Sequence, residues 1–106
     1  MSRLDSIGKH KTTVFADATG ALCVRYHNTV VAKLDRDGTI TLNSGGWRTR
    51  TTMLRMNQAM RQWAVAGKFF YVYQRKFVWY VGQYLGDGQH STDKREYSDH
   101  MQLRSN

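Results

Sequence analysis

The spacing of hydrophobic residues changes twice along this chain, and no other feature of the sequence restricts the fold as strongly. Alternation of apolar and polar residues predicts a short strand at 12–20 and then a three-stranded meander of 21–27, 30–35 and 39–43. The spacing becomes helical over 51–66, and β-branched and aromatic residues return over 68–82. Because this last run exceeds the usual length of one strand, we expect a hairpin that turns at 74–76.

The predicted helix has one apolar side and one mixed, polar side. The apolar side consists of Met53, Met56, Met60, Trp63 and Ala64, and the opposite side of Leu54, Arg55, Gln58, Arg61 and Gln62. Thr49, Thr51 and Thr52 are candidate N-caps, and Gly67 is suited to ending the helix. Methionine adapts to the irregular surface of a sheet, so we assign the methionine-rich side to the hydrophobic core.

These elements predict an α+β fold: an antiparallel β-meander, one amphipathic helix and then a β-hairpin. We expect two layers, with the helix across one face of the sheet. The chain has 106 residues, enough for a single small domain, which we assign to 12–86. Residues 1–11 are predicted to form a flexible lead, and residues 87–106 a polar, disordered tail. Because so small a core stabilises weakly, a homodimer or a stabilising partner is a further expectation.

Positive charge is concentrated in the middle of the chain. The formal net charge is +8, and the segment 39–86 contains no Asp or Glu. Its basic residues are Arg48, Arg50, Arg55, Arg61, Lys68, Arg75 and Lys76. Repulsion within such a segment does not stabilise a fold, so we expect an anionic partner; a solvated surface kept for solubility is the alternative.

The stretch LNSGGWRTRTTMLRMNQ, at 42–58, joins the meander to the helix and suggests an anion site. Gly45 and Gly46 allow a sharp reversal and expose backbone N–H groups ahead of the helix N-terminus. Further candidate ligands of phosphate are Arg48, Arg50, Thr51, Thr52 and Arg55, with Trp47 as a core cap or a base-stacking residue. The alternative is a packing corner without a ligand.

The closing hairpin suggests a second contact surface. Alternation places Phe69, Tyr71 and Tyr73 on one face of the sheet, and the helix can cover only one face. Candidates for base stacking or for an interface are Tyr71, Tyr73 and Trp79, flanked by the basic residues Lys68, Arg75 and Lys76. Arg61 is a further candidate for nucleic-acid binding. The same exposed aromatic residues could instead contact a protein partner or a second copy of the chain.

Catalytic, metal and cofactor sites are not expected. Asp35, Asp37 and Gly38 imitate part of a calcium loop, but Lys33 stands where the first ligand belongs. Cys23 and His27 are too far apart on one strand to share a metal ion. The Asp and Glu residues lie mostly in predicted turns and tails, so no catalytic residue is assigned. A single cysteine, with no signal peptide and no long apolar run, favours a cytoplasmic protein without a membrane partner.

The runs YHNTVVAKL, TITLNSGGWRTRTTMLRMNQ and VYQRKFVWYV resemble small tailed-phage proteins that share the pattern T-x-V-V…I-x-L-N-S-G-G-W/Y-R-T-x-T-T. The resemblance spans about residues 25–82 and implies a phage accessory protein made in the cytoplasm of a bacterial host. Two functions remain open. The first is binding of nucleic acid through the basic segment. The second is steric inhibition of a host enzyme or defence complex, for host takeover or counter-defence, without catalysis.

Overall fold

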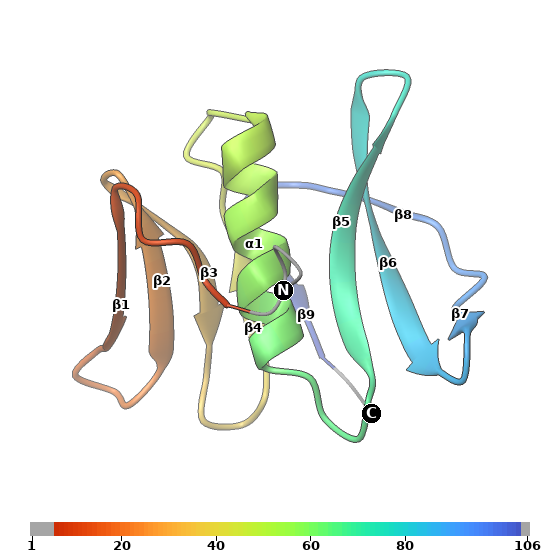
Figure 1. Ribbon diagram of the computed structural model, residues 1–106, viewed down its shortest axis with the longest axis horizontal. Helices are drawn as coiled ribbons and strands as arrows, with labels where there is room; N and C mark the ends of the chain where they lie inside the picture. The colour runs from red at the N-terminus through yellow and green to blue at the C-terminus, as the bar shows by residue number, and fades with distance from the viewer. Residues whose placement is uncertain (1–5, 105–106) are drawn as a thin grey trace.

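The computed structural model describes residues 6–104, shown as a ribbon in Figure 1. Within these residues the elements are β1 (Thr12–Ala16), β2 (Leu22–Tyr26), β3 (Thr29–Leu34), β4 (Ile40–Leu42), α1 (Arg50–Gln62), β5 (Phe69–Arg75), β6 (Val78–Gly86), β7 (Gln89–His90), β8 (Arg95–Glu96) and β9 (Met101–Leu103). The strands form two antiparallel sheets, and α1 packs against strands of both. The α+β fold predicted from the sequence is confirmed.

The first sheet has the strand order β1-β2-β3-β4-β9 and contains the predicted meander. Val24, Ala32 and Leu42 oppose one another across β2, β3 and β4, and all three side chains are fully buried. This row faces α1, whose main partners in this sheet are β2 and β3. Burial of a continuous apolar row fixes the register, because a shift by one residue would turn the row to the other face.

The second sheet is built on the β5–β6 hairpin, which carries β7 and β8 along β6. Phe70 and Val72 of β5 are buried together with Trp79 and Val81 of β6, so one face of the hairpin joins the core. The predicted hairpin is present, but it turns at residues 76 and 77 instead of 74–76. Both turn residues have positive φ values, 50° and 69°, which is the geometry of a two-residue type I′ turn.

Helix α1 begins close to the predicted position and ends earlier than predicted. Thr49 is its N-cap, and the Thr49 hydroxyl accepts a hydrogen bond from the Thr52 N–H at 3.2 Å. The helix ends at Gln62 because a tight turn follows, in which Ala66 and Gly67 have positive φ values of 53° and 75°. Gly67 therefore serves this turn and not the helix terminus itself.

The helix is buried on more than its methionine-rich side. Met56 and Met60 lie in the core, as predicted. Arg55 and Gln58 were expected on the open side, yet both are also buried, with exposed fractions of 6% and 4%. The amphipathic pattern alone does not show this, because the covering segment is distant in sequence.

The covering segment is the stretch that precedes β1. Gly8 donates its backbone N–H to Oε1 of Gln58 at 3.0 Å, and Ile7 packs against the core. The prediction of a flexible lead is therefore wrong for residues 6–11, which lie across the helix. Residues 1–5 of that lead are outside the described part of the chain.

Residues 87–104, predicted to be part of a disordered tail, complete both sheets. Strands β7 and β8 pair with β6, and β9 pairs with β4. Tyr97 and Leu103 belong to the core, with exposed fractions of 1% and 0%. Between β8 and β9 the chain passes from the second sheet to the first (Figure 1). The tail prediction is therefore wrong for residues 87–104, because two apolar anchors and backbone pairing hold a segment whose composition is polar.

Candidate nucleic-acid interface

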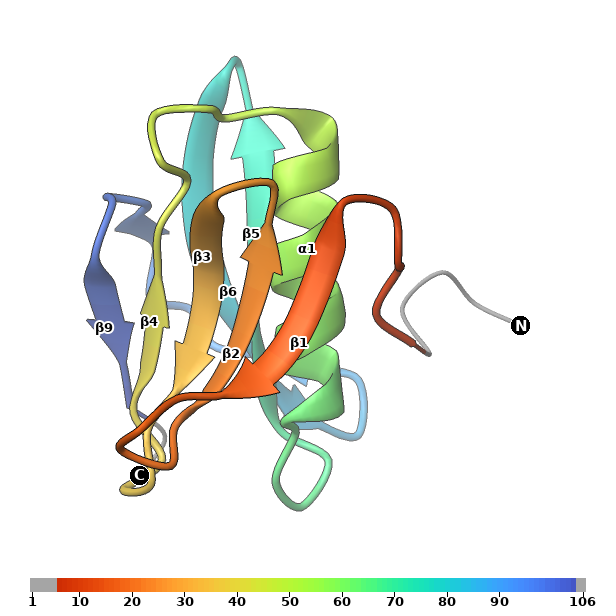
Figure 2. The same ribbon diagram turned by 90° about the vertical axis from the view of Figure 1, so that its left-hand side faces the viewer.

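The connections between strands lie at two opposite ends of the molecule because successive strands are antiparallel (Figures 1 and 2). One end holds the β2–β3 turn, the β4–α1 loop with the helix N-terminus, and the tip of the β5–β6 hairpin. Basic side chains gather there, so we call it the basic end. They are Lys9, Lys11, Arg25, Arg48, Arg50, Arg75 and Lys76.

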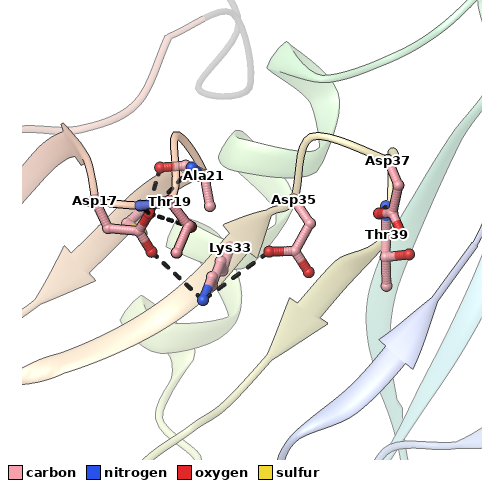
Figure 3. Close-up of polar contacts among 8 residues, drawn as sticks. Asp17, Thr19, Ala21, Lys33, Asp35, Asp37 and Thr39 are labelled. Atoms are coloured by element: carbon pink, nitrogen blue, oxygen red, sulfur yellow. Dashed lines mark hydrogen bonds and ion pairs between the residues drawn. The ribbon is translucent and has the colours of Figure 1, made fainter.

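The opposite end carries acidic residues that are already paired. Figure 3 shows Lys33 between Asp17 and Asp35, with nitrogen-to-oxygen distances of 3.4 Å and 3.9 Å. A hydrogen bond from the Thr19 hydroxyl is the main reason that the pKa of Asp17 falls to about 2, with smaller contributions from two backbone N–H groups and the lysine. These carboxylates therefore neutralise local cations and leave the other end of the molecule unbalanced.

Apart from Arg48, which is near the Asp99 carboxylate, the cations of the basic end have no such acidic partner within residues 6–104. Within residues 6–104, none of these basic side chains forms an ion pair with a carboxylate. Unpaired positive charge on one end of a small domain produces a local field that attracts anionic ligands.

An open groove of about 580 Å³ at the start of β1 collects the N-terminal cations of the basic end. Its lining is Lys9, Lys11, Thr12, Thr13, Arg25, His27 and Asn28. His27 donates its backbone N–H to the carbonyl of Lys11 at 2.8 Å, which fixes the β2–β3 turn against the entry to β1. The lining of the groove therefore combines two ammonium groups and one guanidinium group with polar side chains, a composition suited to contacts with phosphate oxygens.

A second hollow, of about 380 Å³, adjoins this groove because both are lined by His27 and Asn28. Its remaining lining is Tyr26, Thr29, Val31, Ser44, Trp47, Thr49 and Thr52. The β2–β3 turn forms one wall, and the β4–α1 loop forms the other. Trp47 is 72% exposed, so most of its indole is open to solvent.

The Gly-Gly corner of the β4–α1 loop is satisfied within the chain. Gly45 donates its N–H to Oδ1 of Asn43 at 3.0 Å, and Gly46 donates to Oγ of Ser44 at 3.2 Å. Both glycines have positive φ values, 65° and 85°, so the expected sharp reversal is present. The prediction that these two amides face an external anion is wrong, because their donors are already used.

The anion at this corner is the carboxylate of Asp99. Its Oδ1 accepts hydrogen bonds from the Ser44 N–H at 3.0 Å, the Ser44 hydroxyl at 2.7 Å and the Tyr97 hydroxyl at 2.7 Å. Burial raises the pKa of Asp99, but these hydrogen bonds and the nearby Arg48 outweigh burial, and the pKa lies below its usual value. Burial is also the main cause of the raised pKa of Tyr97.

Four side chains of the predicted anion site differ in how available they are to an external ligand. Arg48 lies over the Tyr97 ring, 4.9 Å from its centroid, whereas Arg50 is exposed and makes no ion pair within residues 6–104. Thr51 is half-buried. Thr52 is 2% exposed and forms a hydrogen bond of 3.0 Å with the hydroxyl of the N-cap, so it belongs to the helix cap.

Arg55 was predicted to contact phosphate, and the structure contradicts this. Its Nε donates to Oγ1 of Thr12 at 2.9 Å, its Nη1 donates to Oε1 of Gln58 at 3.1 Å, and its guanidinium lies over the Tyr26 ring at 5.8 Å. A Cβ at position 8 would collide with the same guanidinium, which shows how closely the N-terminal segment covers it. Arg55 is therefore a buried link between the helix and β1.

The remaining predicted cations divide between the two ends. Arg75 and Lys76 flank the tip of the β5–β6 hairpin at the basic end. Arg61 and Lys68 lie at the opposite end, where Arg61 covers the Phe69 ring at 4.6 Å. The single basic patch predicted over 48–76 is thus not continuous in space, because the helix carries its two termini to opposite ends.

The predicted aromatic face of the hairpin exists, with one exception. Tyr71 and Tyr73 lie half-buried on the face turned away from the core, and the Tyr73 ring stacks on Tyr80 at 5.6 Å. Trp79 was also predicted there, but it is 2% exposed and its Nε1–H donates to Gln74 in the core side of the sheet. Alternation explains the difference, since Trp79 is adjacent to Tyr80 and must face the other way.

Sequence reasoning missed the groove residues Lys9, Lys11 and Arg25. Lys9 and Lys11 stand close together in the sequence, which was a usable sign of a basic segment. Their position beside Arg25 and His27 depends on the pairing of β1 with β2, in which Thr13 opposes Arg25. No local pattern gives this arrangement.

Within residues 6–104, no three His, Cys, Asp or Glu side chains form a group that could hold a metal ion. In the same part of the chain, no helix is long and apolar enough to cross a membrane. The absence of a metal ion, a cofactor and a catalytic residue from the predicted site remains an expectation.

Comparison with known proteins supplies a family. The family model described as Kyanoviridae Gp96 protein matches residues 1–104, which is nearly the whole chain. Neither the curated proteins nor the solved structures contain a match to it. This agrees with the resemblance to phage proteins, although the family model does not test the specific sequence pattern quoted above. The chain therefore belongs to the Kyanoviridae Gp96 family of phage proteins.

Proposed function

We propose that this phage protein binds nucleic acid through the phosphate backbone, using the groove at its basic end. The observation that carries the proposal is the collection of Lys9, Lys11 and Arg25 around one groove, with no carboxylate paired to them within residues 6–104. A polyanion releases its condensed counterions when such cations neutralise its phosphates, and this release supplies sequence-independent affinity.

The corner and the hairpin tip extend the proposed contact beyond the groove. Arg50 at the helix N-terminus is exposed, and Arg75 and Lys76 lie at the hairpin tip on the same end. Arg48 contributes less, because it packs on Tyr97 beside the Asp99 carboxylate. The proposed mode of action is binding without catalysis, in the cytoplasm of a bacterial host.

The salt dependence of binding tests this function. Each phosphate contact contributes roughly −0.7 to the slope of log K against log salt on a single strand, and roughly −0.9 on duplex DNA. The Lys9→Ala, Lys11→Ala, Arg25→Ala variant should therefore flatten the slope by about 2 on a single-stranded oligonucleotide. Fluorescence anisotropy over a series of salt concentrations gives this slope directly.

A matched control removes the same charge from the opposite end of the molecule. The variant Arg36→Ala, Arg61→Ala, Lys68→Ala also lowers the formal net charge by three, from +8 to +5. It should retain the wild-type slope if position matters and total charge does not. Equal slopes for the two triple variants, or no binding by the wild type at low salt, would reject the proposed interface.

A second candidate function, steric inhibition of a host protein complex, is favoured by the hairpin tip. Phe77 is 93% exposed and has a positive φ of 69° in a turn that glycine or asparagine would fit with less strain. An exposed aromatic residue at a projecting tip is suited to a pocket on a protein partner. Capture of a defined host complex by the wild type and not by Phe77→Asp, in nuclease-treated lysate, would favour this function over nucleic-acid binding.

A further inference from the structure

The hollow beside the groove has the size and composition of a site for a small planar ligand. Its volume of about 380 Å³ lies within the range of roughly 300–1,000 Å³ that small-molecule sites occupy. Tyr26, His27 and Trp47 provide aromatic surface, and the hydroxyls and amide of the remaining lining provide polar groups. This combination suits a ligand with a flat apolar face and a polar edge.

Three aromatic side chains line the hollow: Trp47 is open to solvent, and Tyr26 and His27 are in contact with each other. The Tyr26 and His27 rings meet edge to face, with centroids 4.4 Å apart. Arg55 lies over the Tyr26 ring at 5.8 Å and holds that side of the wall in place. Trp47 stands on the opposite wall and is mostly exposed. A flat ligand entering between the walls would therefore find an accessible indole face.

Some polar side chains of the hollow already form hydrogen bonds within the described part of the chain, and others do not. The Thr49 and Thr52 hydroxyls bind each other, and the Ser44 hydroxyl is committed to Asp99. Within residues 6–104, the side chains of Asn28 and Thr29 make no hydrogen bond. An amide and a hydroxyl that are free to donate and accept can pair with the edge of a nucleobase.

The position of the hollow connects it to the phosphate groove. Both share His27 and Asn28, so a strand whose backbone follows Lys9, Lys11 and Arg25 passes directly beside the hollow. A base in a duplex is stacked and paired and cannot turn aside without a cost, whereas a base in a single strand can be splayed out and stacked on an aromatic side chain.

We propose that the hollow takes one unstacked base of a single-stranded nucleic acid, with Trp47 as the stacking residue and Asn28 and Thr29 at the polar edge of the base. This inference rests on the proposed function, because the groove must hold the backbone for the base to reach the hollow. It adds a substrate class: single strands should bind more tightly than duplexes of the same sequence.

The test compares binding of two single strands that share one backbone. One is an oligodeoxythymidine of about 12 nucleotides, within the usual site sizes of single-strand binders. The other has the same sugar-phosphate backbone with abasic sites in place of the bases. Anisotropy at fixed low salt should show tighter binding of the strand with bases. Quenching of tryptophan fluorescence should accompany that binding and should be weaker with Trp47→Phe.

Variants of two exposed apolar residues complete the test. Trp47→Ala should weaken binding of the base-containing strand by about 5- to 140-fold, and should leave binding of the abasic strand unchanged. Trp47→Phe should keep most of the affinity, since a phenyl ring can still stack. Val65→Ala shortens an apolar side chain that is 69% exposed at the opposite end of the molecule, and should have little effect.

The outcomes separate this inference from the function on which it rests. Equal affinity for the two strands, or wild-type affinity in Trp47→Ala, would overturn the base site while leaving phosphate binding in place. An equal loss in Val65→Ala would also overturn the base site, since the loss would not be specific to the hollow. If the wild type binds neither strand at low salt, both the base site and the proposed function fail.

Discussion

Leu103 lies in the last strand of the first sheet, where its side chain is fully buried opposite Ile40 of β4. The substitution Leu103→Ala removes most of this side chain from a core position near the end of the chain. Truncation of a buried leucine to alanine costs about 2–5 kcal/mol, because transfer free energy is lost and a cavity remains. β9 is an edge strand that can partly relax, so we expect about 3 kcal/mol.

A loss of this size is large for a domain of this length. Native domains are stable by about 5–15 kcal/mol, and each kcal/mol moves the Tm of a small domain by about 4–8 °C. Leu103→Ala should therefore lower the Tm by about 12–24 °C. Thermal and urea unfolding followed by circular dichroism measure the change, and the urea midpoint should fall with little change in slope.

The neighbouring exposed residue provides the control. Gln102 belongs to the same strand and points to solvent, so Gln102→Ala should change the unfolding free energy by less than about 0.5 kcal/mol. If the unfolding free energies of Leu103→Ala and Gln102→Ala differ by less than about 0.5 kcal/mol, the usual limit for a surface change, the C-terminal segment is not part of the core. The pairing of β9 with β4 would then be incorrect.

Three further predictions concern the loops and the carboxylate of Asp99. Gly46→Ala should lower the unfolding free energy by about 1 kcal/mol, because of the positive φ at this position alone. Gly45→Ala should lower it by more, because the added Cβ would also collide with a threonine side chain of β3. Chemical denaturation of both variants gives the ranking. The double substitution Lys76→Asn, Phe77→Gly should raise stability by about 1 kcal/mol in the same assay, because both turn residues have positive φ. Asp99→Ala should cost about 2–4 kcal/mol, because it leaves two buried hydroxyl partners unsatisfied, whereas Asp99→Asn should cost less. The pKa of Asp99 is lower in the folded protein than in the unfolded chain. Its contribution to stability is therefore complete above the unfolded pKa and is lost as the pH falls through the folded pKa. In thermal melts taken from pH 5 to pH 2, the wild type should lose more stability than Asp99→Asn.

Local patterns in the sequence were enough to predict strands β1 to β4, the helix and the β5–β6 hairpin. Alternation in 21–43 and helical spacing after Thr49 come from side chains that contact one shared core, so the period is visible without knowing the partners. The N-cap and the positive φ of Gly45 and Gly46 are likewise short-range effects. The end of the helix was less predictable, because the tight turn after Gln62 has no strong sequence mark before Gly67.

Two of the errors come from contact between segments far apart in the sequence. Arg55 has the spacing of an exposed helical residue. It is buried because the N-terminal segment covers it and Thr12 accepts a hydrogen bond from it. The C-terminal segment is polar in composition, yet Tyr97 and Leu103 enter a core built by earlier strands. Trp79 differs, since alternation from Tyr71 and Tyr73 through the hairpin would have placed it correctly if the turn had been set at 76 and 77.

The carboxylate of Asp99, at the Gly-Gly corner of the β4–α1 loop, affects both the order and the charge of the basic end. A loop with two glycines beside a helix N-terminus would ordinarily be mobile or would depend on a ligand for order. Here Asp99 ties Ser44 to Tyr97, and the hydroxyl of Ser44 in turn accepts the N–H of Gly46. Trp47 is therefore presented by a loop that is already fixed, so a ligand that stacks on it loses less entropy on ordering the site. The same carboxylate lies near Arg48 and reduces the charge available there. The groove, Arg50 and the hairpin tip are left as the parts of the basic end with unbalanced charge. In the proposed binding mode the hollow and the groove would have separate roles, with preformed aromatic surface in one and free positive charge in the other.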